Sequence, residues 1–337
     1  MLLSDRFKYV PFRNPIFMGN YKKKILRKFE SIRDPLKKLD CIICSHHLFK
    51  KISEIDCLGV YYPTGICKNC GNVQQIEYYG EKDLHVLYSF FFRKIYHDDN
   101  IEKVFQTQKK RGFDIINFIG KERVNKIKTV LEIGAGPGGI LKSFLEKGKE
   151  VTGMELYKKD VDYGLQQGVN IIYHGNIKTF DNNKKFDLII LSHFLEHIVD
   201  CKDFLAEVMQ FLSENGMIYI EVPSLETVEQ DQNSNYYNLM TYFKQIHVIH
   251  FCEHSFKNLL SSTGYKIIKF DNFIKGLVIP IYKYRKVAPH YQYSVDLLKR
   301  IEWKYEIFMA GQRHIIKKLK QYRLNGMEFL WSKNKTH

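Results

Sequence analysis

Apolar positions recur with two different periods along the chain. After residue 126, short apolar runs alternate with amphipathic stretches. The apolar runs that predict strands are 128–133, 150–155, 169–173, 186–191, 217–222 and 265–270. The stretches that predict helices are 138–147, 161–167, 203–212 and 255–262, and a turn is expected at 213–216. Because strands that alternate with helices form a parallel sheet covered on both faces, this part predicts an α/β domain of the Rossmann-like type.

The rest of the chain has other patterns. The predicted organisation is 1–35, a basic N-terminal segment; 36–85, a domain with paired cysteines; 86–125, a helical connector; 126–275, the α/β domain; and 276–337, a basic helical extension. Pro11, Pro15 and Pro35 break any long helix in the first segment. In the connector, apolar residues recur at helical spacing.

Composition and charge restrict the class of protein. The 337 residues are 45% hydrophobic, which predicts a sizeable core. No run approaches the roughly 20 apolar residues of a membrane span, and the first residues lack the apolar core of a signal peptide. We therefore expect a cytoplasmic protein, with peripheral membrane contact left open.

The net charge of +15 comes partly from Lys22–Lys24 and from a tail that includes Lys317, Lys318, Lys320 and Arg323. It indicates one of two things. The first is a partner with phosphates, such as a nucleotide-linked substrate, nucleic acid or an anionic membrane. The second is a lysine-rich surface that is solvated by water and has no specific partner.

A glycine-rich run follows the first predicted strand of the α/β domain and opens a helix. The run reads VLEIGAGPGG, and its glycines let the backbone turn sharply and let a ligand approach. Gly134, Gly136 and Gly139 also satisfy the G-x-G-x-x-G dinucleotide fingerprint. Glu132 separates the two interpretations, because its carboxylate suits the ammonium group of a methionine moiety and repels a pyrophosphate. Glu155, at the end of the next strand, suits the ribose hydroxyls of either cofactor.

Three later segments complete a series of motifs, namely Asn176–Ile177, Phe186–His197 and Leu212–Pro223. With the glycine-rich run, they resemble the class I S-adenosylmethionine-dependent methyltransferases over about residues 126–270. The resemblance implies a seven-stranded, mostly parallel sheet whose last strand is antiparallel. It also implies S-adenosylmethionine as the cofactor.

The same resemblance implies a role for each cofactor-binding residue. Those that would line the methionine and the ribose are Glu132, Gly134, Ala135, Gly136 and Gly138. Glu155 would hold the ribose hydroxyls. Asn176 and the backbone of Ile177 would read the adenine, and Ser192 and His193 would face the sulfonium. The family more often has aspartate in place of Asn176, but an amide oxygen can also accept a hydrogen bond from the adenine amino group.

Four of the seven cysteines form two Cys-x-x-Cys pairs, Cys41/Cys44 and Cys67/Cys70, with 22 residues between the pairs. In a protein without an export signal, such pairs indicate a metal site rather than disulfides. Four thiolates suit tetrahedral Zn²⁺, and a closed four-ligand site is structural. The His46–His47 pair could replace a thiolate. A zinc ribbon that contacts nucleic acid is the alternative to a structural staple.

The cysteine segment is similar to the N-terminal zinc-binding segment of many bacterial methyltransferases. These include sugar-nucleotide C-methyltransferases and enzymes of surface-polysaccharide clusters. The similarity rests on residues 67–75, 87–96 and 185–222. The spacing between the pairs is short for the C-methyltransferase type, and its N-terminal catalytic tyrosine has only Tyr88 and Tyr96 as candidates. The acceptor atom, oxygen or carbon, is therefore left open.

His193, Glu196 and His197 form a His-x-x-Glu-His segment after the fourth strand of the α/β domain, at the edge where doubly wound folds bind ligands. We expect His197, oriented by Glu196, to act as general base. The same residues could hold a divalent cation, could only shape the site, or could match one class of zinc proteases by spacing alone. His247 or His250 is expected to complete the pocket.

Together these features predict methyl transfer from S-adenosylmethionine to a small polar acceptor, a sugar or a sugar nucleotide. The polar segment 224–240, with Asp231, Tyr236 and Tyr237, could form a lid over it. A nucleic-acid methyltransferase is the alternative that charge and zinc favour. Against it, Ser192–Phe194 is not the Asn/Asp-Pro-Pro-aromatic motif of many base N-methyltransferases. A non-catalytic adapter is a second alternative, and the intact glycine-rich run argues against it.

Overall fold

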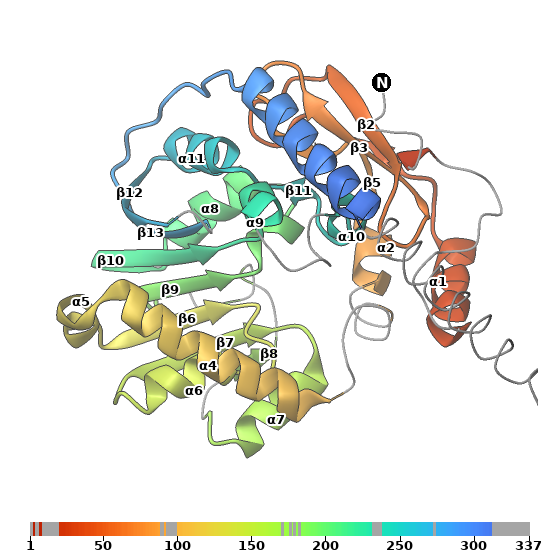
Figure 1. Ribbon diagram of the computed structural model, residues 1–337. Coiled ribbons are helices and arrows are strands. Elements are labelled where there is room, and N and C mark those ends of the chain that lie inside the picture. The colour runs from red at the N-terminus through yellow and green to blue at the C-terminus, as the bar shows by residue number, and fades with distance from the viewer. Residues whose placement is uncertain are drawn as a thin grey trace, which may run out of the picture.

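The computed structural model describes residues 3, 7–8, 20–87, 91, 100–169, 172–174, 177, 180, 183–230, 238–271 and 274–311. Two main sheets and a separate two-stranded sheet organise these residues (Figure 1). The larger sheet is formed by residues after 128, and the smaller one mainly by the N-terminal part of the chain. No described helix is both long and apolar enough to cross a membrane.

The large sheet has the strand order β12-β13-β10-β9-β6-β7-β8. Its strands are β6 (Thr129–Ile133), β7 (Glu150–Glu155), β8 (Ile172–His174), β9 (Phe186–Ser192), β10 (Leu212–Glu221), β12 (Tyr265–Phe270) and β13 (Lys275–Pro280). Neighbours from β8 through β10 are parallel, and β13 is antiparallel to both β10 and β12. The predicted Rossmann-like, mostly parallel α/β fold is confirmed.

Helices cover both faces of the large sheet. Successive side chains of a strand point to opposite faces, so each strand contributes to two apolar clusters. Val130 and Leu188 belong to one apolar cluster, and Leu131 and Ile189 belong to the other. The helices over the first face are α4 (Ile101–Ile119), α5 (Lys121–Lys126), α6 (Gly139–Leu145) and α7 (Lys158–Gln166). The helices over the second face are α8 (Cys201–Met209) and α11 (Glu253–Ser262).

The small sheet is antiparallel and has the order β11-β4-β3-β2. Its strands are β2 (Phe49–Ile55), β3 (Tyr61–Cys67), β4 (Val73–Gln75) and β11 (Ile249–His250), and β1 (Lys37–Lys38) pairs with β5 (Glu77–Tyr78) beside it. Helices α1 (Asn20–Ile32) and α2 (Glu81–Val86) flank this part of the chain. We call residues 37–78 the cysteine module.

The cysteine module is joined to the large sheet by packing as well as by strand pairing. Tyr62 of the module belongs to the same apolar cluster as Leu131 of β6. A helix over 291–311 runs along the small sheet (Figure 1), and its Val295 packs in one cluster with Ile52 and Val73. The two sheets therefore share a continuous core.

Two parts of the large sheet differ from the sequence prediction. The apolar pattern does not predict β13, and the expected domain boundary after residue 275 falls inside this strand. The turn expected at 213–216 is part of β10, whose register with β9 shifts between Leu212 and Met217. Gly216 allows close pairing there, because a Cβ would lie 2.8 Å from the Phe186 carbonyl oxygen.

Segment 224–240 is partly helical. It contains α9 (Leu225–Gln230), and α10 (Leu239–Tyr242) begins at its end. The tyrosines and the aspartate that the sequence suggested for the lid and for the N-terminal catalytic position are outside the described residues; they are Tyr88, Tyr96, Asp231, Tyr236 and Tyr237.

Candidate active site at the carboxyl edge of the large sheet

The loop after β6 forms a cradle that requires glycine. Gly134, Gly136 and Gly138 have φ angles of 76°, 54° and 82°, a region that residues with a Cβ rarely adopt. A Cβ at Gly134 would lie 2.5 Å from the Phe194 ring, and one at Gly136 would lie 2.8 Å from Gln108 Nε2. Positive φ angles and these close side chains therefore both require glycine in the loop, which lies at the sheet edge where α/β folds bind nucleosides.

Two carboxylates flank the loop. Glu132 is 1% exposed, and its Oε2 has no hydrogen-bond partner among the described residues. Burial raises the pKa of Glu132 well above its usual value, and the charge of Arg111 offsets this in part. Because a buried carboxylate with a free oxygen is stabilised by a cation, this position fits the ammonium group of S-adenosylmethionine.

Glu155, at the end of β7, faces the same loop. Its two oxygens accept hydrogen bonds from the backbone N–H groups of Gly136 at 2.8 Å and Tyr157 at 2.7 Å. Each carboxylate oxygen keeps a second lone pair, so the side chain can still accept from ribose hydroxyls.

The remaining predicted cofactor residues are placed as follows. Ala135 is fully buried within the loop, and Ile177 is 8% exposed. Ser192 ends β9, and its hydroxyl donates to Glu221 Oε2 at 3.3 Å. Asn176 lies outside the described residues, so its contact with adenine stays a prediction.

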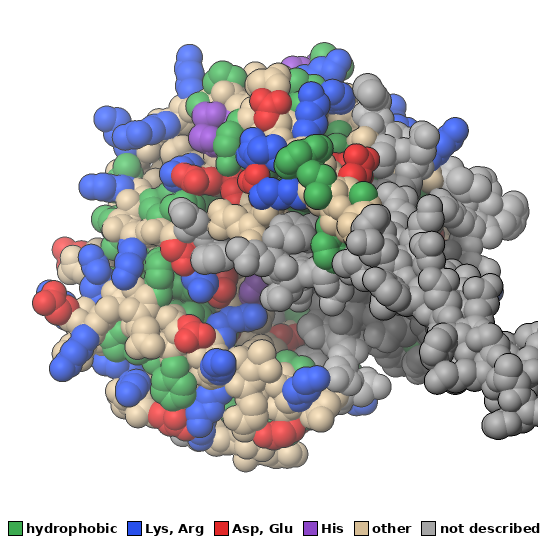
Figure 2. Space-filling model, in the orientation of Figure 1, with side chains coloured by type: hydrophobic (Ala, Val, Ile, Leu, Met, Phe, Trp, Pro, Cys, Tyr) green, Lys and Arg blue, Asp and Glu red, His purple; other side chains and the backbone are tan. Residues whose placement is uncertain are grey.

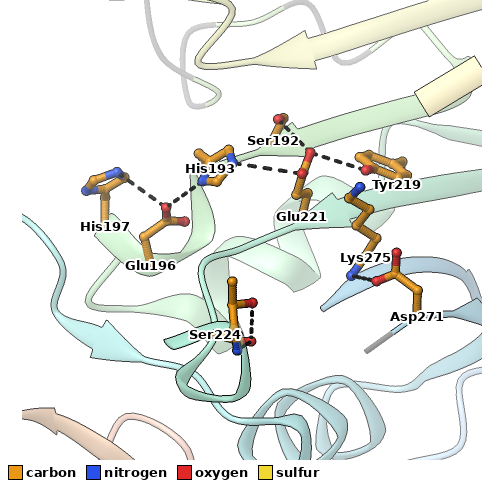
Figure 3. A network of polar contacts seen from close by, with 10 residues as sticks. Ser192, His193, Glu196, His197, Tyr219, Glu221, Ser224, Asp271 and Lys275 are labelled. Atoms are coloured by element: carbon orange, nitrogen blue, oxygen red, sulfur yellow. Dashed lines mark hydrogen bonds and ion pairs between the residues drawn. The ribbon is translucent and has the colours of Figure 1, made fainter. Parts of the chain in front are cut away.

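A row of polar side chains follows β9 and β10 at the carboxyl edge of the sheet (Figure 3). We call Ser192, His193, Glu196, His197 and Glu221 the polar wall. His193 lies between the two carboxylates, with its Nδ1 3.6 Å from Glu196 Oε1 and its Nε2 3.9 Å from Glu221 Oε1. His193 has a φ of 51°, and Leu195–His197 form a 3₁₀ turn. The three residues of the His-x-x-Glu-His segment thus converge through a turn and not through a regular helix.

His197 is oriented by the segment that precedes β11. Its Nδ1 donates to the Ile246 carbonyl oxygen at 2.7 Å, which leaves Nε2 facing Glu196 Oε1 at 3.8 Å. Burial disfavours the charged form of Glu196, but the imidazoles of His197 and His193 outweigh it and lower the pKa of this carboxyl. Glu196 is therefore an ionised group beside the ring nitrogen that can take a proton.

His247 and His250 face different neighbours. The ring of His247 lies 5.0 Å from that of His197, whereas the Nε2 of His250 meets Gln75 Nε2 of the cysteine module at 3.3 Å. Burial lowers the pKa of His247 well below its usual value and that of His250 to about 3, so both rings are neutral. One ligand atom each of Glu196, His197 and His247 lies within 4.8 Å of the others. The set differs from the divalent-cation alternative predicted for the His-x-x-Glu-His segment, because His247 takes the place of His193.

The four paired cysteines converge in the cysteine module. Their Sγ atoms all lie within 4.8 Å of one another, with Cys41–Cys70 and Cys44–Cys67 each at 3.5 Å. These distances exclude disulfides, whose sulfurs are about 2.05 Å apart. Thiolates around zinc at about 2.3 Å would lie roughly 3.8 Å apart, so the donor set fits a tetrahedral Zn²⁺ site.

A buried amide connects this cluster to the polar wall. Gln74 Oε1 accepts from Ile42 N–H, within the first Cys-x-x-Cys pair, at 2.8 Å, and its Nε2 donates to the Asp40 carbonyl at 3.0 Å. Gln74 pairs with Ile249 of β11, and Val248 N–H donates to the Glu196 carbonyl at 2.8 Å. A continuous set of hydrogen bonds therefore runs from the cysteines to the 3₁₀ turn that carries His197.

Sequence reasoning missed several residues of this region. A cavity of about 200 Å³ lies between α4 and the ends of β10 and β13, and its charged and hydroxyl-bearing lining includes Lys110, Arg111, Asp114, Tyr219, Glu221 and Lys275. Glu221 could have been found, because it ends a predicted strand at the ligand-binding edge. Arg111 belongs to a helix that carries no motif, so its position is known only from the packing of α4.

The strand order, the glycine cradle and the buried Glu132 define a nucleoside-binding α/β domain. A family model described as a methyltransferase domain matches residues 96–269, slightly more than half of the chain. The chain therefore belongs to this methyltransferase-domain family, and S-adenosylmethionine is the cofactor that the family and the site share.

Curated methyltransferases are similar over part of the chain. The chain is 28% identical over 109 residues to (S)-tetrahydroprotoberberine N-methyltransferase of Eschscholzia californica, covering 30% of this chain and 31% of the relative. It is 27% identical over 96 residues to the ubiquinone biosynthesis O-methyltransferase of Rickettsia prowazekii (strain Madrid E), covering 27% of this chain and 38% of the relative. The chain thus spans about a third of the length of these relatives.

Solved structures of methyltransferases are also similar. The plantazolicin methyltransferase BpumL in complex with SAH is 18% identical, with a TM-score of 0.36 and coverage of 50% of this chain and 68% of that one. A SAM-dependent methyltransferase from Archaeoglobus fulgidus is 22% identical, with a TM-score of 0.39 and coverage of 54% and 79%.

Proposed function

We propose that this protein transfers a methyl group from S-adenosylmethionine to an oxygen or carbon of a sugar or sugar nucleotide used in surface-polysaccharide or related biosynthesis. The observation that carries the proposal is the polar wall. It sets carboxylates, imidazoles and a hydroxyl beside the glycine cradle, and these groups suit an acceptor rich in hydroxyls. The cysteine module, joined to such a wall, supports the same class of acceptor.

The proposed chemistry divides between cofactor and protein. S-adenosylmethionine, when bound, supplies a methyl group already activated by its sulfonium. The protein then has to align the acceptor and remove its proton. His197 Nε2 accepts that proton, and the adjacent ionised Glu196 stabilises the imidazolium. His193, Ser192 and Glu221 orient the acceptor hydroxyls.

We further propose that Cys41, Cys44, Cys67 and Cys70 hold a structural Zn²⁺. Support comes from the convergence of four Sγ atoms at near-tetrahedral spacing. A closed set of four thiolates leaves no open coordination position for chemistry.

The basic composition does not by itself favour nucleic acid as the acceptor. On the face drawn in Figure 2, the Lys and Arg side chains of the described residues are spread between Asp and Glu and do not form one stripe. A continuous basic stripe is the usual electrostatic footprint of a nucleic-acid partner.

The test is methyl transfer from labelled S-adenosylmethionine to a panel of sugar nucleotides and, in parallel, to RNA. We expect label in a sugar nucleotide, and a loss of about 100-fold or more in turnover for His197→Gln, because a positioned base contributes roughly 10²–10⁴-fold. His254→Gln, at a partly exposed histidine away from the wall, is the matched control. Label that appears only in RNA would overturn the proposal.

A further inference from the structure

Residues 281–286 follow β13 and form an exposed segment in which tyrosine alternates with basic residues. Tyr282 and Tyr284 are 70% and 67% exposed. Its three cations are exposed as well, and they form no ion pair or side-chain hydrogen bond with the residues that the structure describes; they are Lys283, Arg285 and Lys286. We call residues 281–286 the aromatic–basic segment. It presents both apolar rings and unneutralised charge to a ligand.

The aromatic–basic segment is held in place near both ends. Ile281 N–H donates to the Gly264 carbonyl at 2.8 Å, and Arg285 N–H donates to the Ser261 carbonyl at 2.9 Å. Tyr282 has a φ of 51°, a left-handed value that a residue with a Cβ keeps only where surrounding contacts fix it. The two tyrosines are therefore presented on a fixed backbone.

The rings of Tyr282 and Tyr284 border a cavity of about 250 Å³. Its other walls come from the end of α8 and are Ala206, Met209 and Gln210. Water fills about 30 Å³ per molecule in the liquid, so the cavity has room for roughly eight heavy atoms, about the size of one planar heterocycle. The lining is apolar and aromatic except for the amide of Gln210, which can both donate and accept hydrogen bonds.

This cavity lies at the edge of the large sheet that is opposite the polar wall. Glu221 of the wall pairs with Lys275, the first residue of β13. The strand then runs away from the wall to Pro280, which pairs with Tyr265 at the start of β12. A ligand in the cavity would therefore bind apart from the glycine cradle and from the proposed acceptor.

The cavity and the cations together suit a ligand that has one flat ring and several negative charges. Bases stack on aromatic side chains, and lysine and arginine bind phosphate oxygens. We propose that the aromatic–basic segment and the end of α8 form a binding site for a nucleoside diphosphate. Its base stacks against Tyr282 and Tyr284, its phosphates lie beside the three cations, and the Gln210 amide hydrogen-bonds the edge of the base.

Free nucleotides and sugar nucleotides share this chemistry. Because the cavity has room for a single ring, one nucleotide fits it better than a nucleic-acid strand does. The site is separate from the polar wall, so the proposal does not depend on which acceptor receives the methyl group.

Calorimetry on the full-length chain saturated with S-adenosylhomocysteine tests the site, because the glycine cradle is then occupied. The probe is UDP. We expect UDP to bind the wild type and Tyr284→Ala to weaken it about 10-fold or more, the effect of losing a stacked base. Arg285→Gln should weaken UDP several-fold, because a charge-assisted contact to phosphate is lost. Trp303→Ala, at an aromatic residue that is 62% exposed on the helix over 291–311, is the matched control and should bind UDP like the wild type.

UDP-glucose in the same experiment distinguishes the two sources. Equal affinity for UDP and UDP-glucose would support a free nucleotide, and tighter binding of UDP-glucose with the same Tyr284 dependence would support a sugar nucleotide. The proposal fails if UDP at millimolar concentration does not bind the saturated wild type, or if Tyr284→Ala binds it equally well. Single-stranded oligouridine that binds far more tightly than UDP would also overturn it, in favour of a nucleic-acid surface. Unchanged affinity of Tyr284→Ala for S-adenosylhomocysteine shows that the variant is folded.

Discussion

Three histidines near the polar wall have the same side chain but different chemistry, because their surroundings differ. The side chain of His197 is 17% exposed and has a carboxylate partner. His247 and His250 are almost fully buried, and burial lowers the pKa of both. His197 is therefore the ring that we propose as the base, whereas the other two are neutral groups.

Burial of His250 predicts how stability depends on pH. Its pKa falls from about 6.5 to about 3 on folding, so below pH 6.5 the unfolded chain binds a proton that the folded chain does not. The contribution is fully present above pH 6.5 and is lost as pH falls toward 3. Between pH 6.5 and pH 5, the wild type should lose unfolding free energy through this group. In His250→Asn, the free energy of unfolding should fall by about 1.5–2 kcal/mol less over the same interval.

Urea unfolding at the two pH values measures this difference. His254→Asn is the control, because that ring is partly exposed and its pKa is shifted less by burial. An equal pH dependence in the wild type and in His250→Asn would contradict the prediction.

At the scale of elements, the contact between α4 and α6 brings a helix without a motif to the cofactor loop. Gly139→Ala should weaken this contact, because the new methyl group meets a backbone oxygen that cannot rotate away. Overpacking of this kind costs about 1–3 kcal/mol. We expect a lower melting temperature and weaker binding of S-adenosylhomocysteine. Gly311→Ala is the matched control, since a Cβ there has no neighbour within 4 Å.

The length of each local apolar run decides which elements the sequence could predict. Strands β6, β7 and β9 have apolar runs long enough to be recognised, and the motifs that follow them locate the cradle and most of the polar wall. Strand β13 was missed because its place depends on pairing with β10 and β12, which a local pattern does not contain. Arg111 was missed for the same reason, since only the packing of α4 brings it to the site.

At the scale of the molecule, the cysteine module holds the segment that orients His197. Cys67→Ser should therefore reduce bound zinc from one per chain to well below one, and should lower turnover several-fold more than it lowers affinity for S-adenosylhomocysteine. The reason is that Gln74 and β11 lie between the cysteines and His197, whereas the glycine cradle does not. Metal analysis, calorimetry and turnover measure the three quantities.

Cys57→Ser is the control for this prediction, because its thiol lies outside the cluster of four. Normal zinc content in Cys67→Ser would contradict the metal assignment. Equal losses of turnover and cofactor affinity would contradict the connection between the module and His197.

Strand β11 also has a consequence for how the chain folds. Gln75 and His250, which meet across the pairing of β4 and β11, are 175 residues apart. During synthesis, β4 leaves the ribosome long before its partner and presents an open sheet edge, a surface prone to pairing with other chains. A fragment that ends before residue 249 would keep this edge permanently. The N-terminal part, when it is produced alone, should therefore aggregate, even though it contains all four cysteines of the proposed zinc site.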